Sequence, residues 1–240
     1  MSTALVTGAA SGMGAAVAKR FAGDGYTVVC SDLNVEGAAK VASGLAGARA
    51  EAVDITDPAS VDDLINSCGE DLEAVVHAAG ILSSARVLEL SLEDFDRIVS
   101  VNLRGTFIVT QAASRALRDN GGGAIVLFAS IEATRAVRGH AHYAASKAGV
   151  VALAQAFAEE LGKSSVRVNA VAPGLIRTAM TDTLIGAGEL EALERRVPLG
   201  RAGDADEVAT VCSFLCSAAA SYVTGVCWQV DGGTLIKSPF

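Results

Sequence analysis

Strand and helix signals alternate along the whole chain, and this alternation is what most constrains its fold. The predicted strands span residues 3–7, 27–31, 48–53, 73–78, 123–129, 165–171 and 226–230. Helix-start signatures follow several of them, at Asp57-Pro58, at Ser91 with Asp94, and at Asp204 with Glu207. We therefore predict one α/β domain over residues 1–240, a doubly wound seven-stranded parallel sheet with helices on both faces. A composition of 51% hydrophobic and 19% charged residues suits a sheet buried on both faces.

The first predicted strand runs into a glycine-rich turn and then an alanine-rich helix. Gly8, Gly12 and Gly14 occupy this turn. Glycines let backbone amides approach a pyrophosphate, and the helix N-terminus favours its negative charge. The spacing differs from G-x-G-x-x-G, and a turn alone can also require glycine. We interpret the segment as a candidate phosphate-binding turn.

The second predicted strand ends at Ser31-Asp32. An acid at this place can accept hydrogen bonds from both hydroxyls of an adenosine ribose, and it would repel the 2′-phosphate of NADP. No Arg or Lys lies near Asp32 in the sequence. This favours NAD over NADP, while a helix-capping role for Asp32 is the alternative.

Tyr143 and Lys147 are four residues apart, so on a helix they share a face. A positive charge beside a phenol favours the phenolate and lowers its pKa from about 10. The pair is therefore a candidate general acid/base. Taken alone, a surface tyrosine with an unrelated lysine is an equally good interpretation.

Several further segments make nearly the whole chain resemble the short-chain dehydrogenase/reductase family. The turn resembles the family's TGxxxGxG motif, Tyr143 and Lys147 fit YxxxK, and Ser130 closes the fifth predicted strand where the catalytic serine belongs. The remaining matches are Asp54 in Val53-Asp54-Ile55-Thr56, His77-Ala78-Ala79-Gly80 against NNAG, Asn102 in Val101-Asn102-Leu103, and Pro173-Gly174 with Thr178.

The resemblance implies a Rossmann fold and reversible hydride transfer between a nicotinamide and an alcohol or carbonyl carbon. It implies that Tyr143 moves the proton, Lys147 lowers the tyrosine pKa and binds the nicotinamide ribose, Ser130 orients the substrate oxygen, and Asn102 holds a water. The implied NAD-binding residues are Gly8, Ser11, Gly12, Met13, Gly14, Asp32, Asp54, Ile55, Ala79, Gly80, Tyr143, Lys147, Pro173, Gly174, Ile176 and Thr178.

One departure from the family pattern is His77, which replaces the first asparagine of NNAG. We expect a structural substitution with His77 hydrogen-bonded locally. His140 and His142 flank the tyrosine; neither is expected to transfer the proton, and either could line the substrate pocket. Three arginines lie near the predicted mouth of the pocket and could bind an anionic substrate, namely Arg135, Arg138 and Arg177. Solvated surface charge is the better interpretation of these residues.

The substrate is left open between a small secondary alcohol, a steroid, a polyol and an acyl thioester. The main alternative activity is a 3-oxoacyl-thioester (acyl-carrier-protein) reductase. A nucleotide-sensing protein without turnover is a remote alternative, because Asn102, Ser130, Tyr143 and Lys147 are all present. Residues 175–200 are predicted to form a lid over the substrate.

The formal net charge of -8 opposes binding to nucleic acid. No apolar run approaches the roughly 20 residues that span a bilayer, and no secretory signal is recognised at the start. Five scattered cysteines indicate free thiols in a reducing cytoplasm, with neither a disulfide framework nor a metal site. By resemblance we expect a homotetramer, with 223–240 as one candidate contact.

Overall fold

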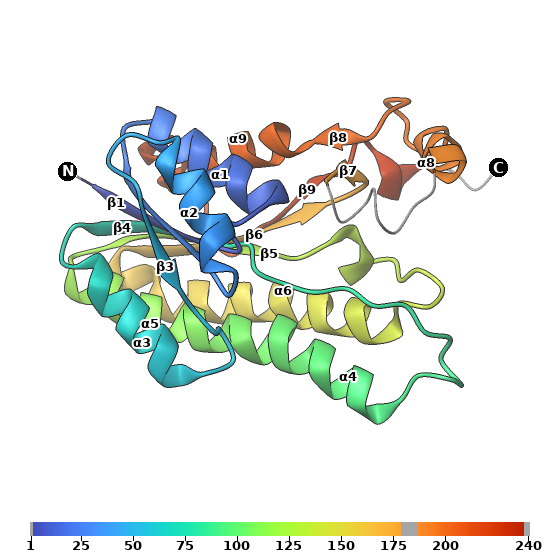
Figure 1. Cartoon of the computed structure of the whole chain (residues 1–240), viewed down its shortest axis with the longest axis horizontal. Helices are drawn as coiled ribbons and strands as arrows, with labels where there is room; N and C mark the ends of the chain where they lie inside the picture. The colour runs from blue at the N-terminus through green and yellow to red at the C-terminus, as the bar shows by residue number, and fades with distance from the viewer. Residues whose placement is uncertain (1, 179–186, 238–240) are drawn as a thin grey trace.

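The structure, a computed structural model, describes residues 2–178 and 187–237. Its seven-stranded sheet is parallel throughout, in the order β3-β2-β1-β4-β5-β6-β9 (Figure 1). The strands are β1 Thr3–Thr7, β2 Thr27–Asp32, β3 Arg49–Ala52, β4 Leu72–His77, β5 Gly123–Phe128, β6 Val166–Pro173 and β9 Cys227–Val230. The predicted fold class is confirmed.

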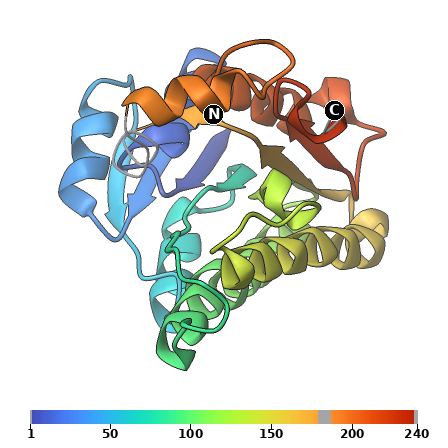
Figure 2. The same cartoon turned by 90° about the vertical axis from the view of Figure 1, so that its right-hand side faces the viewer.

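Helices cover both faces of the sheet, as Figure 2 shows with the sheet between two helical layers. One layer holds α1 Gly12–Gly23, α2 Val35–Ser43 and α9 Ala205–Cys216. The other holds α3 Pro58–Cys68, α4 Leu92–Val99, α5 Thr106–Asp119 and α6 Ala141–Leu161. A π-helical turn, η1 Ser100–Gly105, joins α4 to α5. The short helix α8 is Ala187–Glu194, and the 3₁₀ turns are η2 Ile131–Ala133, η3 Gly162–Ser164, η4 Ala218–Ala220 and η5 Thr234–Ile236.

The central strands are apolar on both faces because each face packs on a helical layer. Leu5, Val75 and Ile125 belong to the core cluster beneath α3, α5 and α6. Their strand neighbours Val6 and Val76 belong to the cluster beneath α1 and α9. Side chains alternate between the faces of a strand, so continuous apolar runs are expected in a sheet that is covered twice.

The predicted helix starts are confirmed by their capping bonds. The Asp57 side chain accepts from the Ala59 amide, and the Ser91 side chain accepts from the Asp94 amide. Asp204 and Glu207 form a reciprocal capping box at the start of α9. Each bond satisfies a backbone N–H that a helix N-terminus leaves without an intrahelical partner.

A second, two-stranded sheet pairs β7 Ile176–Arg177 with β8 Gly203–Asp204. Two residues are too few to give a periodic sequence signal, so this pair was not predicted. Residues 179–186 of the expected lid lie outside the described residues, and the lid stays a prediction.

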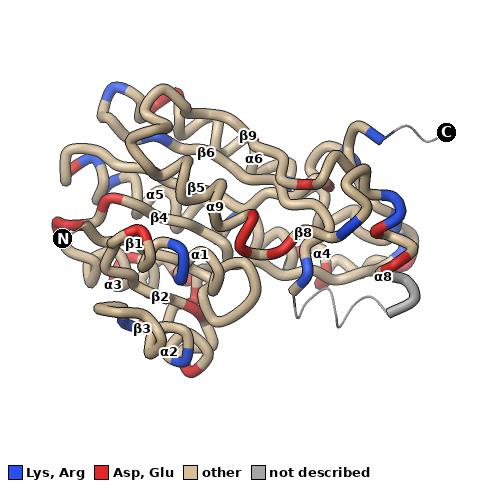
Figure 3. The backbone as a smooth tube through the Cα atoms, turned by 90° about the horizontal axis from the view of Figure 1, so that it is seen from above, with Lys and Arg blue, Asp and Glu red and all other residues tan. Residues whose placement is uncertain are grey.

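Acidic and basic residues are interspersed over the outer helices and loops (Figure 3). All five cysteines are free, and Cys227 alone among them is not fully buried. In the part of the chain that the structure describes, no helix is long and apolar enough to cross a membrane, and no cluster of three metal-ligating side chains occurs.

Candidate active site

The predicted site segments meet at the C-terminal edge of the sheet, where the loops after parallel strands converge. The glycine turn after β1 packs directly on the loop after β4. Gly8 has φ +72°, and a Cβ added there would lie 2.6 Å from the Ala79 amide nitrogen. A Cβ on Gly14 would run into the Gly8 carbonyl. Only glycine fits both positions, so this turn is a compact backbone cradle.

The cradle ends at the N-terminus of α1, where Ser11 is the N-cap and makes no side-chain capping bond. Backbone N–H groups at such a terminus, together with the helix dipole, suit a diphosphate. Asp32 lies beside it: one carboxylate oxygen accepts from the Ala10 amide at 3.1 Å and the other from the Asn34 amide at 2.9 Å. Asn34 caps α2, so the alternative role of Asp32 as that cap is wrong. These residues fit a dinucleotide.

The remaining predicted cofactor residues surround the same edge. Asp54 accepts from the Thr56 amide and hydroxyl at 2.9 and 2.7 Å, and these bonds lower the pKa of the Asp54 carboxyl. A Cβ on Gly12 would lie 3.6 Å from the Thr178 side chain, which brings the segment after β7 against the glycine turn. Ile55, Ile176 and Pro173 are buried, Met13 is half-buried, and Gly174 packs on the Asp231 backbone.

Tyr143 and Lys147 lie one turn apart on α6, as predicted. The Lys147 ammonium is 5.7 Å from the centre of the Tyr143 ring. It donates to the Phe128 carbonyl at 2.7 Å, at the end of β5. Burial lowers the pKa of Lys147 to about 8, because a charged ammonium is disfavoured away from water.

The pKa of Tyr143 differs from the expectation that Lys147 lowers it. The pKa of Tyr143 is raised to about 12: burial is the largest cause, a hydrogen bond with Ser130 acts in the opposite direction, and the charge of Glu132 adds to the rise. The sequence pattern shows the lysine but not how deeply the phenol is buried. A further positive charge near the phenol is needed to bring its pKa down.

Asn102 lies in the π-helical turn, and both ends of its amide are used. Its Oδ1 accepts from the Ile81 amide and its Nδ2 donates to the Ile81 carbonyl, both at 2.8 Å. Nδ2 also donates to the Ser146 hydroxyl at 3.3 Å. A Cβ on Gly80 would lie 3.3 Å from both Asn102 Oδ1 and Lys147 Nζ. The structure thus brings all four predicted catalytic residues around one point beside the glycine cradle.

Comparisons with known proteins show the family of the chain. A family model described as enoyl-(acyl carrier protein) reductase matches residues 8–234. The chain is 39% identical to D-threitol dehydrogenase from Mycolicibacterium smegmatis over 98% of this chain and 93% of the relative. The chain belongs to the short-chain dehydrogenase/reductase family. It is an oxidoreductase fold of the kind that uses a nicotinamide cofactor.

Other members of the family are similarly close. A 3-oxoacyl-(acyl-carrier-protein) reductase from Thermotoga maritima is 38% identical, with 97% of each chain covered. A solved structure described as a 2-deoxy-D-gluconate 3-dehydrogenase from Agrobacterium tumefaciens, with NADP bound, superimposes with a TM-score of 0.91. It is 35% identical and covers 98% of this chain and 97% of its own.

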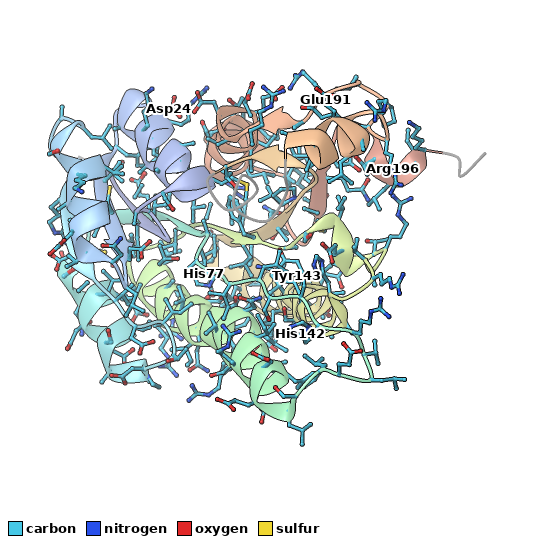
Figure 4. All side chains as sticks on the ribbon, turned by 45° about the vertical axis from the view of Figure 1, so that its right-hand side comes forward. Asp24, His77, His142, Tyr143, Glu191 and Arg196 are labelled. Atoms are coloured by element: carbon cyan, nitrogen blue, oxygen red, sulfur yellow. The ribbon has the colours of Figure 1, made fainter. Side chains whose placement is uncertain are left out.

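The chain has three histidines, and Figure 4 shows two of them, His77 and His142, together with Tyr143 in the interior of the molecule. His77 Nδ1 bonds to the Thr7 hydroxyl at 2.7 Å, which confirms the expected local hydrogen bond. His142 Nε2 bonds to the Ser83 hydroxyl at 2.9 Å. Among the arginines, Arg177 pairs with Glu194 at 2.8 Å, while the guanidinium of Arg135 donates to the Thr234 carbonyl.

His77 also makes the fold sensitive to acid. Burial, and then the Lys147 charge, lower the pKa of His77 to about 3, and its buried Nε2 has no hydrogen-bond partner among the described residues. Between about pH 3 and 6.5 the unfolded chain binds this proton and the folded chain does not, so stability falls with acidification. We expect His77→Asn to reduce that loss by a few kcal/mol at most.

The measurement is urea unfolding of wild type and His77→Asn at pH 8 and at pH 4.5. At pH 8 the imidazole is neutral in both the folded and the unfolded chain. The difference in free energy of unfolding between wild type and variant at this pH therefore reports packing alone. An equal difference in free energy of unfolding at both pH values would contradict the assigned role of His77 protonation.

Sequence reasoning missed Glu132, Ser83 and Ser84 near the site. Glu132 follows Ser130 by two residues, and its amide donates to the Ser130 hydroxyl at 3.1 Å. That spacing was a usable signal. Ser83 and Ser84 lie in an irregular loop after β4, where no periodicity shows which way a side chain points.

Proposed function

We propose that the chain is an NAD-dependent alcohol dehydrogenase/ketoreductase. A secondary alcohol and NAD⁺ become a ketone, NADH and a proton, or the reverse. The observation that carries this proposal is the pair of half-buried Tyr143 and buried Lys147 with Ser130 and Asn102, assembled next to a glycine cradle and Asp32. A protein that bound a nucleotide without turnover would have no use for a phenol beside a buried ammonium.

Each of the four residues has a distinct task in this proposal. Tyr143 takes the alcohol proton or returns it to the developing alkoxide. Lys147 supplies positive charge beside the phenol and binds the nicotinamide ribose. Ser130 donates to the substrate oxygen and stabilises the charge that forms there. Asn102 braces the Ile81 backbone and holds a water that links Lys147 to solvent.

The cofactor would supply the hydride acceptor. Its oxidised nicotinamide carries a positive charge, which would lower the raised pKa of Tyr143. The proposed cofactor residues are those named above from the glycine turn to Thr178. Cofactor binding and proton transfer are therefore coupled through charge. The pKa of the Tyr143 phenol is lowered toward the range needed for proton transfer only when the oxidised cofactor is bound.

The preference for NAD rests on Asp32. Its two oxygens are already positioned by backbone amides at the end of β2, and none of the ion pairs among the described residues engages it. A fixed carboxylate accepts from two ribose hydroxyls and repels a 2′-phosphate.

We expect Asp32→Ala to lower the ratio of kcat/KM with NAD to that with NADP by about tenfold or more, because a bond to a charged group contributes about 1.5–3 kcal/mol. Glu36→Ala is the matched control, since it removes an exposed negative charge from the neighbouring helix. Steady-state rates with both cofactors measure the ratio. An unchanged ratio would mean that Asp32 does not discriminate between the ribose of NAD and the phosphorylated ribose of NADP.

A 3-oxoacyl-thioester reductase is the second candidate. It is supported by the relative from Thermotoga maritima, just as a polyol dehydrogenase is supported by the relative from Mycolicibacterium smegmatis. The two identities are nearly equal, so overall similarity does not choose between them.

The proposed function is tested by NADH formation at mildly alkaline pH across secondary alcohols, hydroxysteroids, polyols and hydroxyacyl thioesters. A parallel NADP series tests the cofactor. Turnover that depends on Tyr143 would support a dehydrogenase, and the best substrate would give its class. Tight NADH binding without turnover of any substrate in either direction would favour the nucleotide sensor.

The proposal extends to a cytoplasmic homotetramer. Free, mostly buried thiols suit a reducing compartment. Exposed apolar side chains at Phe107 on α5 and Trp228 on β9 suit contacts between subunits. Light scattering on the purified protein measures the oligomeric state.

A further inference from the structure

A relay of three polar side chains, here called the Ser84–His140–Glu132 cluster, lies next to the proposed reaction site. His140 Nδ1 is 3.1 Å from both carboxylate oxygens of Glu132, and His140 Nε2 is 2.6 Å from the Ser84 hydroxyl. The three residues come from the loop after β4, from η2 and from the residue that precedes α6. The segments on either side of the catalytic residues thus converge on one imidazole.

The cluster directly adjoins the groups that would carry out the reaction. The rings of His140 and Tyr143 meet edge to face, with their centres 6.2 Å apart. The Glu132 amide donates to the Ser130 hydroxyl at 3.1 Å, and the Glu132 charge raises the pKa of Tyr143. A substrate whose oxygen is held by Ser130 and Tyr143 would therefore have its next carbon near this cluster.

Capacity for further hydrogen bonds remains in the cluster. The Glu132 carboxylate has about four acceptor sites, and in the described part of the chain His140 is its one side-chain partner. The side chains of His140 and Glu132 are 18% and 14% exposed, so they are partly open without being freely solvated. Ser84 is exposed and can both donate and accept.

A charged pair in this position also disfavours substrates with an apolar chain beside the reacting carbon. The bond to Glu132 raises the pKa of His140, which favours an imidazolium–carboxylate pair. Ser83, bonded to His142, adds another hydroxyl from the same loop. An apolar acyl chain laid over these groups would remove water from them without replacing its hydrogen bonds, which is costly. A hydroxylated carbon would replace those bonds.

We propose that the Ser84–His140–Glu132 cluster binds a second hydroxyl, on the carbon next to the one oxidised, so that the substrate class is a vicinal diol or polyol. The Glu132 carboxylate accepts a hydrogen bond from that hydroxyl, and Ser84 with His140 fixes the orientation of the carboxylate. This inference rests on the proposed function, because it takes Tyr143 and Ser130 to hold the reacting oxygen. Glu132 is a specificity-determining residue and takes no part in the proton transfer.

The experiment compares butane-2,3-diol with butan-2-ol, which lacks only the adjacent hydroxyl, using NAD and wild type, Glu132→Gln and Glu159→Gln. Glu159 is an exposed glutamate of α6 and serves as the control. Any change in the pKa of Tyr143 acts on both alcohols, so the ratio of their kcat/KM values isolates recognition of the hydroxyl. We expect a wild-type ratio of about tenfold or more, a loss of most of it in Glu132→Gln through KM, and no change in Glu159→Gln.

A wild-type ratio near one, or Tyr143-dependent turnover of a 3-hydroxyacyl thioester well above that of the diol, would overturn this inference and leave the dehydrogenase intact. A ratio that survives in Glu132→Gln would also overturn it. If nothing is turned over, the proposed function fails separately. The inference is then decided by titrating both alcohols into the NADH complex and following NADH fluorescence, where equal affinity would overturn it.

Discussion

Tyr143→Phe is expected to lower kcat for the best alcohol by about 10²–10⁴-fold, the range that general acid–base groups contribute. Tyr143 is half-buried, and the variant removes only its hydroxyl, which forms a hydrogen bond with Ser130. Neither Lys147 nor the glycine cradle is altered. The dissociation constant for NADH, measured by fluorescence titration, should therefore stay within about threefold of wild type.

The pH profile separates this role from a merely structural one. Burial holds the pKa of Tyr143 high, so wild-type alcohol oxidation should rise with pH as the phenolate becomes available. The residual rate of Tyr143→Phe should lack that rise. Tyr222→Phe removes a hydroxyl from a fully exposed tyrosine and is the matched control. A Tyr143→Phe variant with a near-normal rate would show that another group moves the proton.

Much of this site is readable from local sequence because its residues stand at element boundaries. Asp32 ends β2, Ser130 follows β5, and the spacing of Tyr143 and Lys147 is one helical turn. In a parallel sheet these ends meet at one edge, so order along the chain predicts neighbours in space. The strands were predicted to within about two residues for the same reason, since each is an apolar run between polar loops.

The rest depends on long-range packing that no local pattern encodes. The raised pKa of Tyr143 follows from the desolvation of its phenol in the folded chain. The amide of Asn102 braces Ile81 from a π-helical turn, a geometry with no sequence signature in η1. His140 joins Ser84 and Glu132. It lies 56 residues from Ser84 and 8 residues from Glu132 in the sequence. Such contacts become visible only when the loops after β4 and β5 are placed together.

Lys147→Met is expected to abolish turnover and to stabilise the folded chain. The variant removes the charge beside Tyr143 and the proposed ribose contact, so kcat/KM should fall by about 10³-fold or more. Burial lowers the pKa of Lys147 from 10.5 to about 8, which corresponds to about 3 kcal/mol of penalty on the charged form. The unfolded chain binds more protons between pH 8 and 10.5, so the penalty is complete below pH 8 and disappears above pH 10.5.

The loss of the bond from Lys147 to the Phe128 carbonyl offsets about 1–2 kcal/mol of that gain. We therefore expect a net stabilisation of about 1–2 kcal/mol at pH 7, a rise in Tm of a few degrees for a chain of this size, and a smaller difference at pH 10.5. Lys163→Met, at an exposed lysine, is the control. Thermal unfolding without nucleotide measures the effect. A Tm that falls at pH 7 would mean that the ammonium stabilises the fold. A Tm that rises as turnover is lost would mean that the buried charge is kept for catalysis at the expense of stability.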